Sequence, residues 1–162
     1  MIQEKYNRRI FDEGTEDAIL RLSHLRSNVL SPVGIGDGDN VLIIDPDSEA
    51  LVEWLKEQAT QVTEVAAEML PDIKGTFNII ISLGHLNETP ATLKKMLSAD
   101  GRLVYALPEK DRIADFTKRL LKEAGFSEIT TYRVSPDYLF TTEIYAEDYI
   151  GGGAGDYLLI AK

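Results

Sequence analysis

Two aspartates that follow an apolar run are the first residues of this sequence that could do chemistry. Asp45 and Asp47 come directly after residues 41–44, VLII, and open a predicted helix. Carboxylates at a helix N-terminus either cap the backbone and interact with the helix dipole, or contact a positively charged group of a ligand. Capping is the simpler interpretation, with Asp45 as the N-cap and Pro46 as the first helical residue. In either case the negative charges argue against phosphate, and so against a dinucleotide, at this helix.

A second candidate segment lies where FNIIISL (77–83), the strongest strand signal of the chain, ends. Ser82 and Leu83 close this strand, and His85 follows two residues later. The imidazole of His85 could act as a general base, since histidine exchanges protons near neutral pH. A solvated loop side chain is the simpler alternative. The other histidine, His24, lies in a predicted helix far away in the sequence, so no metal site is expected.

The composition limits the classes of partner. The chain has 162 residues, 44% of them hydrophobic, which fits one domain with a real core. Its 17 basic and 27 acidic residues give a net charge of −10, which repels phosphate, so neither nucleic acid nor an anionic membrane is expected as a partner. No apolar run approaches the roughly 18 residues needed to span a bilayer, so no membrane insertion is expected. The absence of cysteine excludes disulfides, thiolate metal sites and a cysteine nucleophile. We expect a cytoplasmic protein.

Apolar runs that alternate with amphipathic segments predict one compact α/β domain over residues 40–162, preceded by an arm and a helix over 1–39. Strands are predicted at 41–45, 61–66, 77–83, 102–107, 128–134 and 157–161. Helices are predicted at 15–29, 46–59, 90–97 and 110–124.

Buried positions follow from the same patterns. The expected core residues are Ile43, Ile44, Ile79, Ile80, Ile81, Val104, Leu120 and Leu159. The helix at 110–124 is expected to turn Ile113, Phe116, Leu120 and Ala124 inward. Residues 1–14 and 135–156 are expected to be irregular, with a flexible turn at the glycines 151–153.

Three stretches resemble class I S-adenosylmethionine-dependent methyltransferases. Residues 77–108 are similar to a strand, a helix and a Gly turn of that family, and the turn reads LSADGRL here. Residues 120–132, LLKEAGFSEITTY, resemble the family's late helix, Ala-Gly-Phe turn and strand. Residues 136–149, PDYLFTTEIYAEDY, resemble methyltransferases associated with bacterial surface-polysaccharide glycosyltransferases. The resemblance implies a doubly wound, Rossmann-like, mainly parallel sheet with an antiparallel last strand, and S-adenosylmethionine as cofactor.

The cofactor contacts that this resemblance implies are at Asp45, Asp47, Glu64, Ser82 and Leu83. Three departures accompany them. The family's Gly-rich loop after the first strand is replaced by DPDSE (45–49), and its ribose-binding acid aligns with Ala66 or Ala67, although Glu64 and Glu68 lie nearby. Only residues 67–76 separate the second and third predicted strands, too few for a crossover helix plus a strand. We therefore expect the family's third strand to be missing.

Two functions remain open at this point. The first is a non-catalytic binding or scaffold module, a pseudoenzyme with an eroded site, whose partner would be a glycosyltransferase or a second copy of the chain. The alternative is an atypical S-adenosylmethionine-dependent methyltransferase that acts on a hydroxyl of a sugar or small molecule, with His85 as base. Cofactor binding is expected to be weak or absent. The tyrosines near the C-terminus either line a binding surface or cover the sheet edge.

Overall fold

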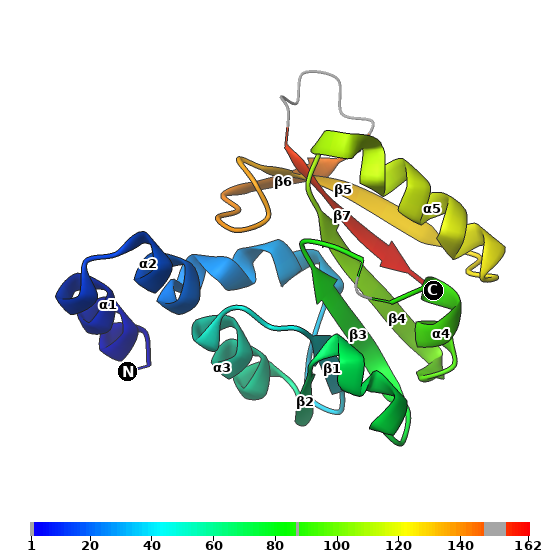
Figure 1. Cartoon of the computed structure of the whole chain (residues 1–162), viewed down its shortest axis with the longest axis horizontal. Coiled ribbons are helices and arrows are strands. Elements are labelled where there is room, and N and C mark those ends of the chain that lie inside the picture. Colours follow the sequence, from blue (N-terminus) through cyan, green and yellow to red (C-terminus); the bar gives the residue numbers. More distant parts are fainter. Residues whose placement is uncertain (1, 87, 148–154) are drawn as a thin grey trace.

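The strands form one seven-stranded mixed sheet in a computed structural model that describes residues 2–86, 88–147 and 155–162 (Figure 1). The strand order is β2-β1-β3-β4-β7-β5-β6. The strands are β1 (Asn40–Ile44), β2 (Gln61–Val65), β3 (Phe77–Leu83), β4 (Leu97–Leu107), β5 (Ile129–Ser135), β6 (Glu143–Ala146) and β7 (Asp156–Ala161). The first four are parallel, and β7 inserts antiparallel between β4 and β5. This arrangement confirms the predicted doubly wound α/β fold with its antiparallel last strand.

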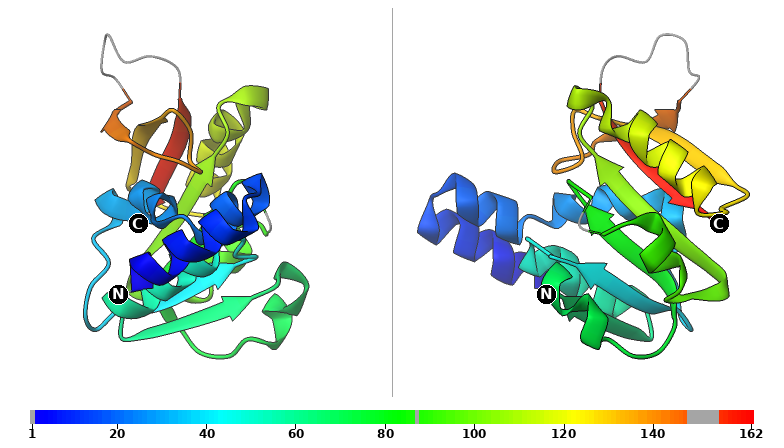
Figure 2. Two further views of the ribbon diagram at one scale, coloured as in Figure 1. Left: turned by 90° about the vertical axis from the view of Figure 1, so that its left-hand side faces the viewer. Right: turned by 45° about the vertical axis from the view of Figure 1, so that its right-hand side comes forward.

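Helices cover both faces of the sheet. They are α1 (Ile2–Glu13), α2 (Glu16–Leu22), α3 (Glu49–Gln58), α4 (Pro90–Lys94) and α5 (Ile113–Glu123), with 3-10 segments η1 (His24–Val33), η2 (Ala67–Asp72) and η3 (Lys110–Arg112). Side chains of α3 and η1 pack on one face, and those of η2, α4 and α5 pack on the other. The α1–α2 pair lies at one end of the molecule, beside α3 (Figure 2). No helix of the described residues is long and apolar enough to cross a membrane.

The interior strand β3, between β1 and β4, contributes to the core on both faces of the sheet. Ile79 and Ile81 face the α3 side, and Ile80 faces the α5 side, so a continuous apolar run is buried on both faces. Seven of the eight predicted core residues are buried, and Leu120 is the exception.

Helix α5 is rotated by about one residue from its predicted orientation. Its buried residues are Ala114, Thr117 and Leu121, while Phe116 is 51% exposed and Leu120 is half-buried. The hydroxyl of Thr117 donates to the carbonyl of Ile113 at 2.7 Å, which satisfies this polar group inside the core. Ile113 and Ala124, which were also expected to face inward, are half-buried and pack against the core, whereas Phe116 faces solvent.

Other predictions about the elements are wrong in type or in extent. The helix predicted at 90–97 ends at Lys94. Residues 2–13 form a helix rather than an irregular arm, because Tyr6 packs against Ala18, Leu22 and Ala50. The helix predicted at 15–29 ends at Leu22 and continues as η1. Strand β4 begins five residues early, at Leu97, and so includes the predicted Asp-Gly turn. Strand β6 lies in a region expected to be irregular, and residues 151–153, expected to form a turn, lie outside the described residues.

Candidate functional site

The strand order reverses between β1 and β3, and the carboxyl ends of these strands lie side by side. In doubly wound sheets this reversal forms the crevice where ligands bind. The turn after β1, the turn after β3 and the loop between β5 and β6 meet here. We call this region the switch-point crevice. It contains most of the residues that the sequence predicted to bind a cofactor or to act as a base.

Asp45 joins the ends of two strands instead of capping a helix. Its N–H donates to the carbonyl of Val65 at 2.8 Å, and its carboxylate accepts the N–H of Ala67 at 3.0 Å. Its φ of +47° is in the left-handed region, which aspartate tolerates better than most residues. The predicted helix start at Asp45 and Pro46 is wrong: the N-cap is Ser48, whose hydroxyl accepts the N–H of Leu51 at 3.2 Å. The helix therefore begins at Glu49.

Asp47 neutralises a buried arginine. Its carboxylate lies 2.6 Å from Nη2 of Arg26, a side chain that is only 1% exposed. Nη1 of Arg26 donates to the carbonyl of Leu20 at 2.7 Å. The sequence analysis missed Arg26. The sequence did contain a sign that Arg26 is buried, because Arg26 follows Leu22 by four residues on a stripe of buried side chains.

The segment after β3 is held by its own hydrogen bonds. The buried hydroxyl of Ser82 donates to the carbonyl of His85 at 3.0 Å, and the N–H of Gly84 donates to the carbonyl of Ala106 at 2.6 Å. Leu83 is half-buried. The side chain of His85 is exposed, and its ring makes no hydrogen bond or ion pair with any described residue. Of this segment, only His85 presents a side chain to solvent with free polar atoms.

Tyr138 packs into the crevice from the loop between β5 and β6. A Cβ added to Gly84 would lie 2.5 Å from the Tyr138 hydroxyl oxygen, so the ring lies directly on the turn after β3. Burial raises the pKa of Tyr138, and the nearby charge of Asp47 raises it further, while Arg26 opposes both effects. Tyr138 thus lies between the turn after β3 and the Asp47–Arg26 pair.

Hydrogen bonds across the sheet fix the loop that carries Tyr138. The Asn28 side-chain amide donates to the carbonyl of Thr141 at 2.9 Å, which ties the loop to η1. The N–H of Tyr138 donates to the carboxylate of Asp156 at 3.0 Å. Asp137 accepts two N–H groups of its own turn, from Leu139 at 2.9 Å and Phe140 at 2.8 Å. The sequence analysis grouped Tyr138 with the C-terminal tyrosines and did not place it here.

Two carboxylates lie near the end of β2, and one of them is paired. The strand ends at Val65, so Ala66 and Ala67 follow it, as the sequence alignment placed them. Glu64 lies one residue before the end and forms an ion pair with Lys56 of α3 at 3.1 Å. Glu68 is exposed in η2.

An open hollow of about 360 Å³ lies beside this site, at the N-terminus of α3. Three carboxylates line it, those of Asp47, Glu49 and Glu64. Each is paired with a cation: Asp47 with Arg26, Glu64 with Lys56, and Glu49 with Arg9 and Arg21. The hydrogen bond from Arg9 lowers the pKa of Glu49. Within the described residues no group of three or more metal-ligating side chains could hold a metal ion.

Replacing Gly84 with alanine tests the packing of Tyr138. We expect a loss of about 1–3 kcal/mol in the free energy of unfolding, because the new Cβ would meet the tyrosine and because φ is +92°. Gly75→Ala is the matched control, since Gly75 has a φ of +103° and no atom within 4 Å of an added Cβ. Urea unfolding should show the larger loss for Gly84→Ala. Equal losses would contradict this position of Tyr138.

Comparison with known proteins supports the fold. No protein-family model and no curated protein matches the sequence. Among solved structures, precorrin 8W decarboxylase from Methanobacterium thermoautotrophicum is 13% identical, with a TM-score of 0.55 over 86% of this chain and 89% of that one. Precorrin-6Y C5,15-methyltransferase from Geobacter metallireducens is 14% identical, with a TM-score of 0.54 over 85% and 86% of the two chains. The chain therefore has the Rossmann-like fold of class I methyltransferases.

Proposed function

We propose that this methyltransferase-fold chain does not use S-adenosylmethionine and works as a binding or scaffold module. One observation carries the proposal: the side chains of Asp45, Asp47 and Ser82 at the switch-point crevice are already paired within the chain, and Tyr138 packs on the turn after β3. Fold alone does not determine function, so the argument depends on these side chains.

The residues of the crevice do not fit the cofactor. A Gly-rich loop would present free backbone N–H groups after β1, whereas here Pro46 has none and the N–H of Asp45 is bonded to Val65. The ribose hydroxyls would meet Ala66 and Ala67, because the carboxylate of Glu64 is bonded to Lys56. The N–H of Asp45 and the carboxylate of Glu64 are therefore already bonded within the chain, and the exposed carboxylate of Glu68 lies three residues beyond the end of β2.

The third missing feature is a strand beside β2 that would line the pocket for the adenine ring. Strand β2 is at the edge of the sheet, and the chain returns from it to β3 through residues 66–76, which contain η2 and no strand. We take this short return as the deletion of the family's third strand. Losing a hydrogen bond to a charged group costs about 1.5–3 kcal/mol, and micromolar affinity is worth about 8 kcal/mol in total. Three such losses remove most of that affinity.

The partner that we propose is a glycosyltransferase or a second copy of this chain. The sequence resemblance at 136–149 supports this choice. Part of the same segment is the loop that fills the crevice, and part is the edge strand β6. In this proposal the inner side of the β5–β6 loop packs on the switch-point crevice, and its outer surface, together with β6, binds the partner.

A second candidate function is that of an atypical methyltransferase acting on a hydroxyl of a sugar or small molecule. The observation that favours it is His85, an exposed imidazole one residue after the turn on which Tyr138 packs. As a general base, His85 would take the proton of the acceptor hydroxyl while the methyl group transfers to its oxygen. This function requires the cofactor to bind.

Calorimetric titration with S-adenosylmethionine distinguishes the two functions. We expect no binding tighter than about 1 mM. A Tyr138→Ala variant is expected not to bind either, because Pro46 and the two alanines remain. Micromolar binding to the unmodified chain, weakened by Asp45→Ala, would overturn the proposal and favour the enzyme. Thermal unfolding of each variant controls for loss of the fold.

A further inference from the structure

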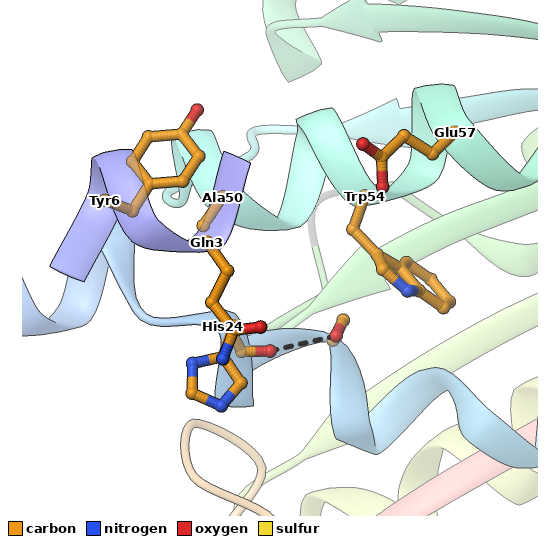
Figure 3. A pocket seen from close by; sticks show the side chains of 7 residues that line it. Gln3, Tyr6, His24, Ala50, Trp54 and Glu57 are labelled. Atoms are coloured by element: carbon orange, nitrogen blue, oxygen red, sulfur yellow. Dashed lines mark hydrogen bonds between the residues drawn. The ribbon is translucent and has the colours of Figure 1, made fainter. Parts of the chain in front are cut away.

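A second cavity lies away from the switch-point crevice, between α1, η1 and α3 (Figure 3). Its volume is about 130 Å³. Drug-sized ligands need roughly 300–1,000 Å³, so this cavity fits one small group. Figure 3 shows Gln3 and His24 on one side of it, and Trp54 and Glu57 on the other. We call it the arm cavity.

Trp54 provides the aromatic surface of the arm cavity. The other aromatic residue, Tyr6, is buried, and its hydroxyl is hydrogen-bonded to Glu53. Two cations of the chain already lie by the Tyr6 ring, with Lys5 Nζ at 5.4 Å and Arg9 at 5.8 Å from its centre. Trp54 has no such neighbour among the residues that the structure describes; it is half-buried against the core and also lines the arm cavity.

Four polar groups around the arm cavity have no partner within the described part of the chain. They are the amide of Gln3, the imidazole of His24, the indole N–H of Trp54 and the carboxylate of Glu57. The neighbouring carboxylates differ, since Glu49 is paired with two arginines and Glu53 with Tyr6. Gln3, His24 and Glu57 are exposed, so water solvates them in the free chain, and a small ligand in the cavity would lie within reach of these groups and of the aromatic wall.

The charge of the arm cavity selects a cation. Glu57 is three residues after Trp54 on α3, so the carboxylate and the indole lie one turn apart on the same side of the helix. A carboxylate beside an indole attracts an organic cation through both the ion pair and the aromatic face. The net charge of −10 favours the approach of cations over anions. We infer that the arm cavity binds a small organic ammonium ion, independently of what the switch-point crevice does.

The fluorescence of Trp54 provides the test, because it is the only tryptophan of the chain. Choline, added to the full chain, should produce a saturable change in emission with a dissociation constant on the order of 1 mM. The neutral analogue 3,3-dimethylbutanol has the same shape without the charge, and it should produce no saturable change at the same concentrations.

Substitution of Glu57 tests the site itself. Glu57→Gln should weaken choline binding at least tenfold. Because Glu57 is exposed, this substitution is not expected to unfold the chain. Glu128→Gln makes the same change in net charge on an exposed residue at the start of β5, and should leave the affinity unchanged. No saturable response to choline would overturn the inference. Equal binding of the neutral analogue, or equal affinity in Glu57→Gln, would also overturn it.

Discussion

Replacing Ile80 with alanine is expected to lower the free energy of unfolding by about 2–5 kcal/mol. Ile80 is 0% exposed and lies in the middle of β3, where its strand neighbours are Leu42 and Leu103. Both of these neighbours share its cluster on the α5 side of the sheet. The truncation would leave a cavity between helices and strands that cannot move toward one another without breaking the sheet.

Urea unfolding at equilibrium measures this loss, and Ile19→Ala is the matched control. Ile19 is 42% exposed on α2, so the same truncation there should cost less than about 1 kcal/mol. A loss below about 1 kcal/mol for Ile80→Ala would show that β3 is not an interior strand with a packed core on this face. The comparison separates burial at this position from any general effect of replacing isoleucine.

Removing the carboxylate of Asp47 is expected to cost about 2–4 kcal/mol. Asp47→Ala would leave the buried guanidinium of Arg26 without its counter-ion, with one hydrogen bond to the carbonyl of Leu20 remaining. Breaking a fully buried pair typically costs about 3–5 kcal/mol. We expect slightly less here because Asp47 is itself 55% exposed, so water can approach its place.

A double variant identifies the cause of that loss. If the cost comes from an unpaired buried charge, Asp47→Ala combined with Arg26→Met should be more stable than Asp47→Ala alone, since methionine fills similar space without charge. Asp12→Ala, which removes a solvent-exposed pair with Arg8, should change stability by less than about 1 kcal/mol. A double variant less stable than Asp47→Ala would mean that the arginine stabilises the fold in some other way.

These two variants also bear on function. Ile80 supports the sheet whatever the protein does, whereas Asp47 and Arg26 occupy the region where a ligand of this fold would bind. A stability loss at Asp47 would indicate that this carboxylate has a structural role. It would then support the proposal that the crevice serves the fold and a partner rather than a cofactor.

Local sequence patterns were sufficient to predict the positions of most strands of the sheet. The apolar runs at β1 and β3 predicted strands within a residue of their observed ends, because a strand buried on both faces needs an uninterrupted apolar segment. The antiparallel last strand followed from the resemblance to methyltransferases. The alignment of Ala66 and Ala67 just after β2 was also available from the sequence, since β2 is short and its end is marked by Val65.

The state of the candidate site was decided by tertiary structure alone. Tyr138 lies on Gly84, and Arg26 reaches Asp47, through contacts between segments far apart in the chain. The inward face of α5, on which Ala114, Thr117 and Leu121 are buried, was also set by packing against the sheet. Periodicity describes a residue's own helix or strand, and it carries no information about which distant side chain fills a given crevice. The sequence therefore indicated that this chain has a methyltransferase-like fold, and packing determined that Tyr138 and the Arg26–Asp47 pair meet at its switch-point crevice.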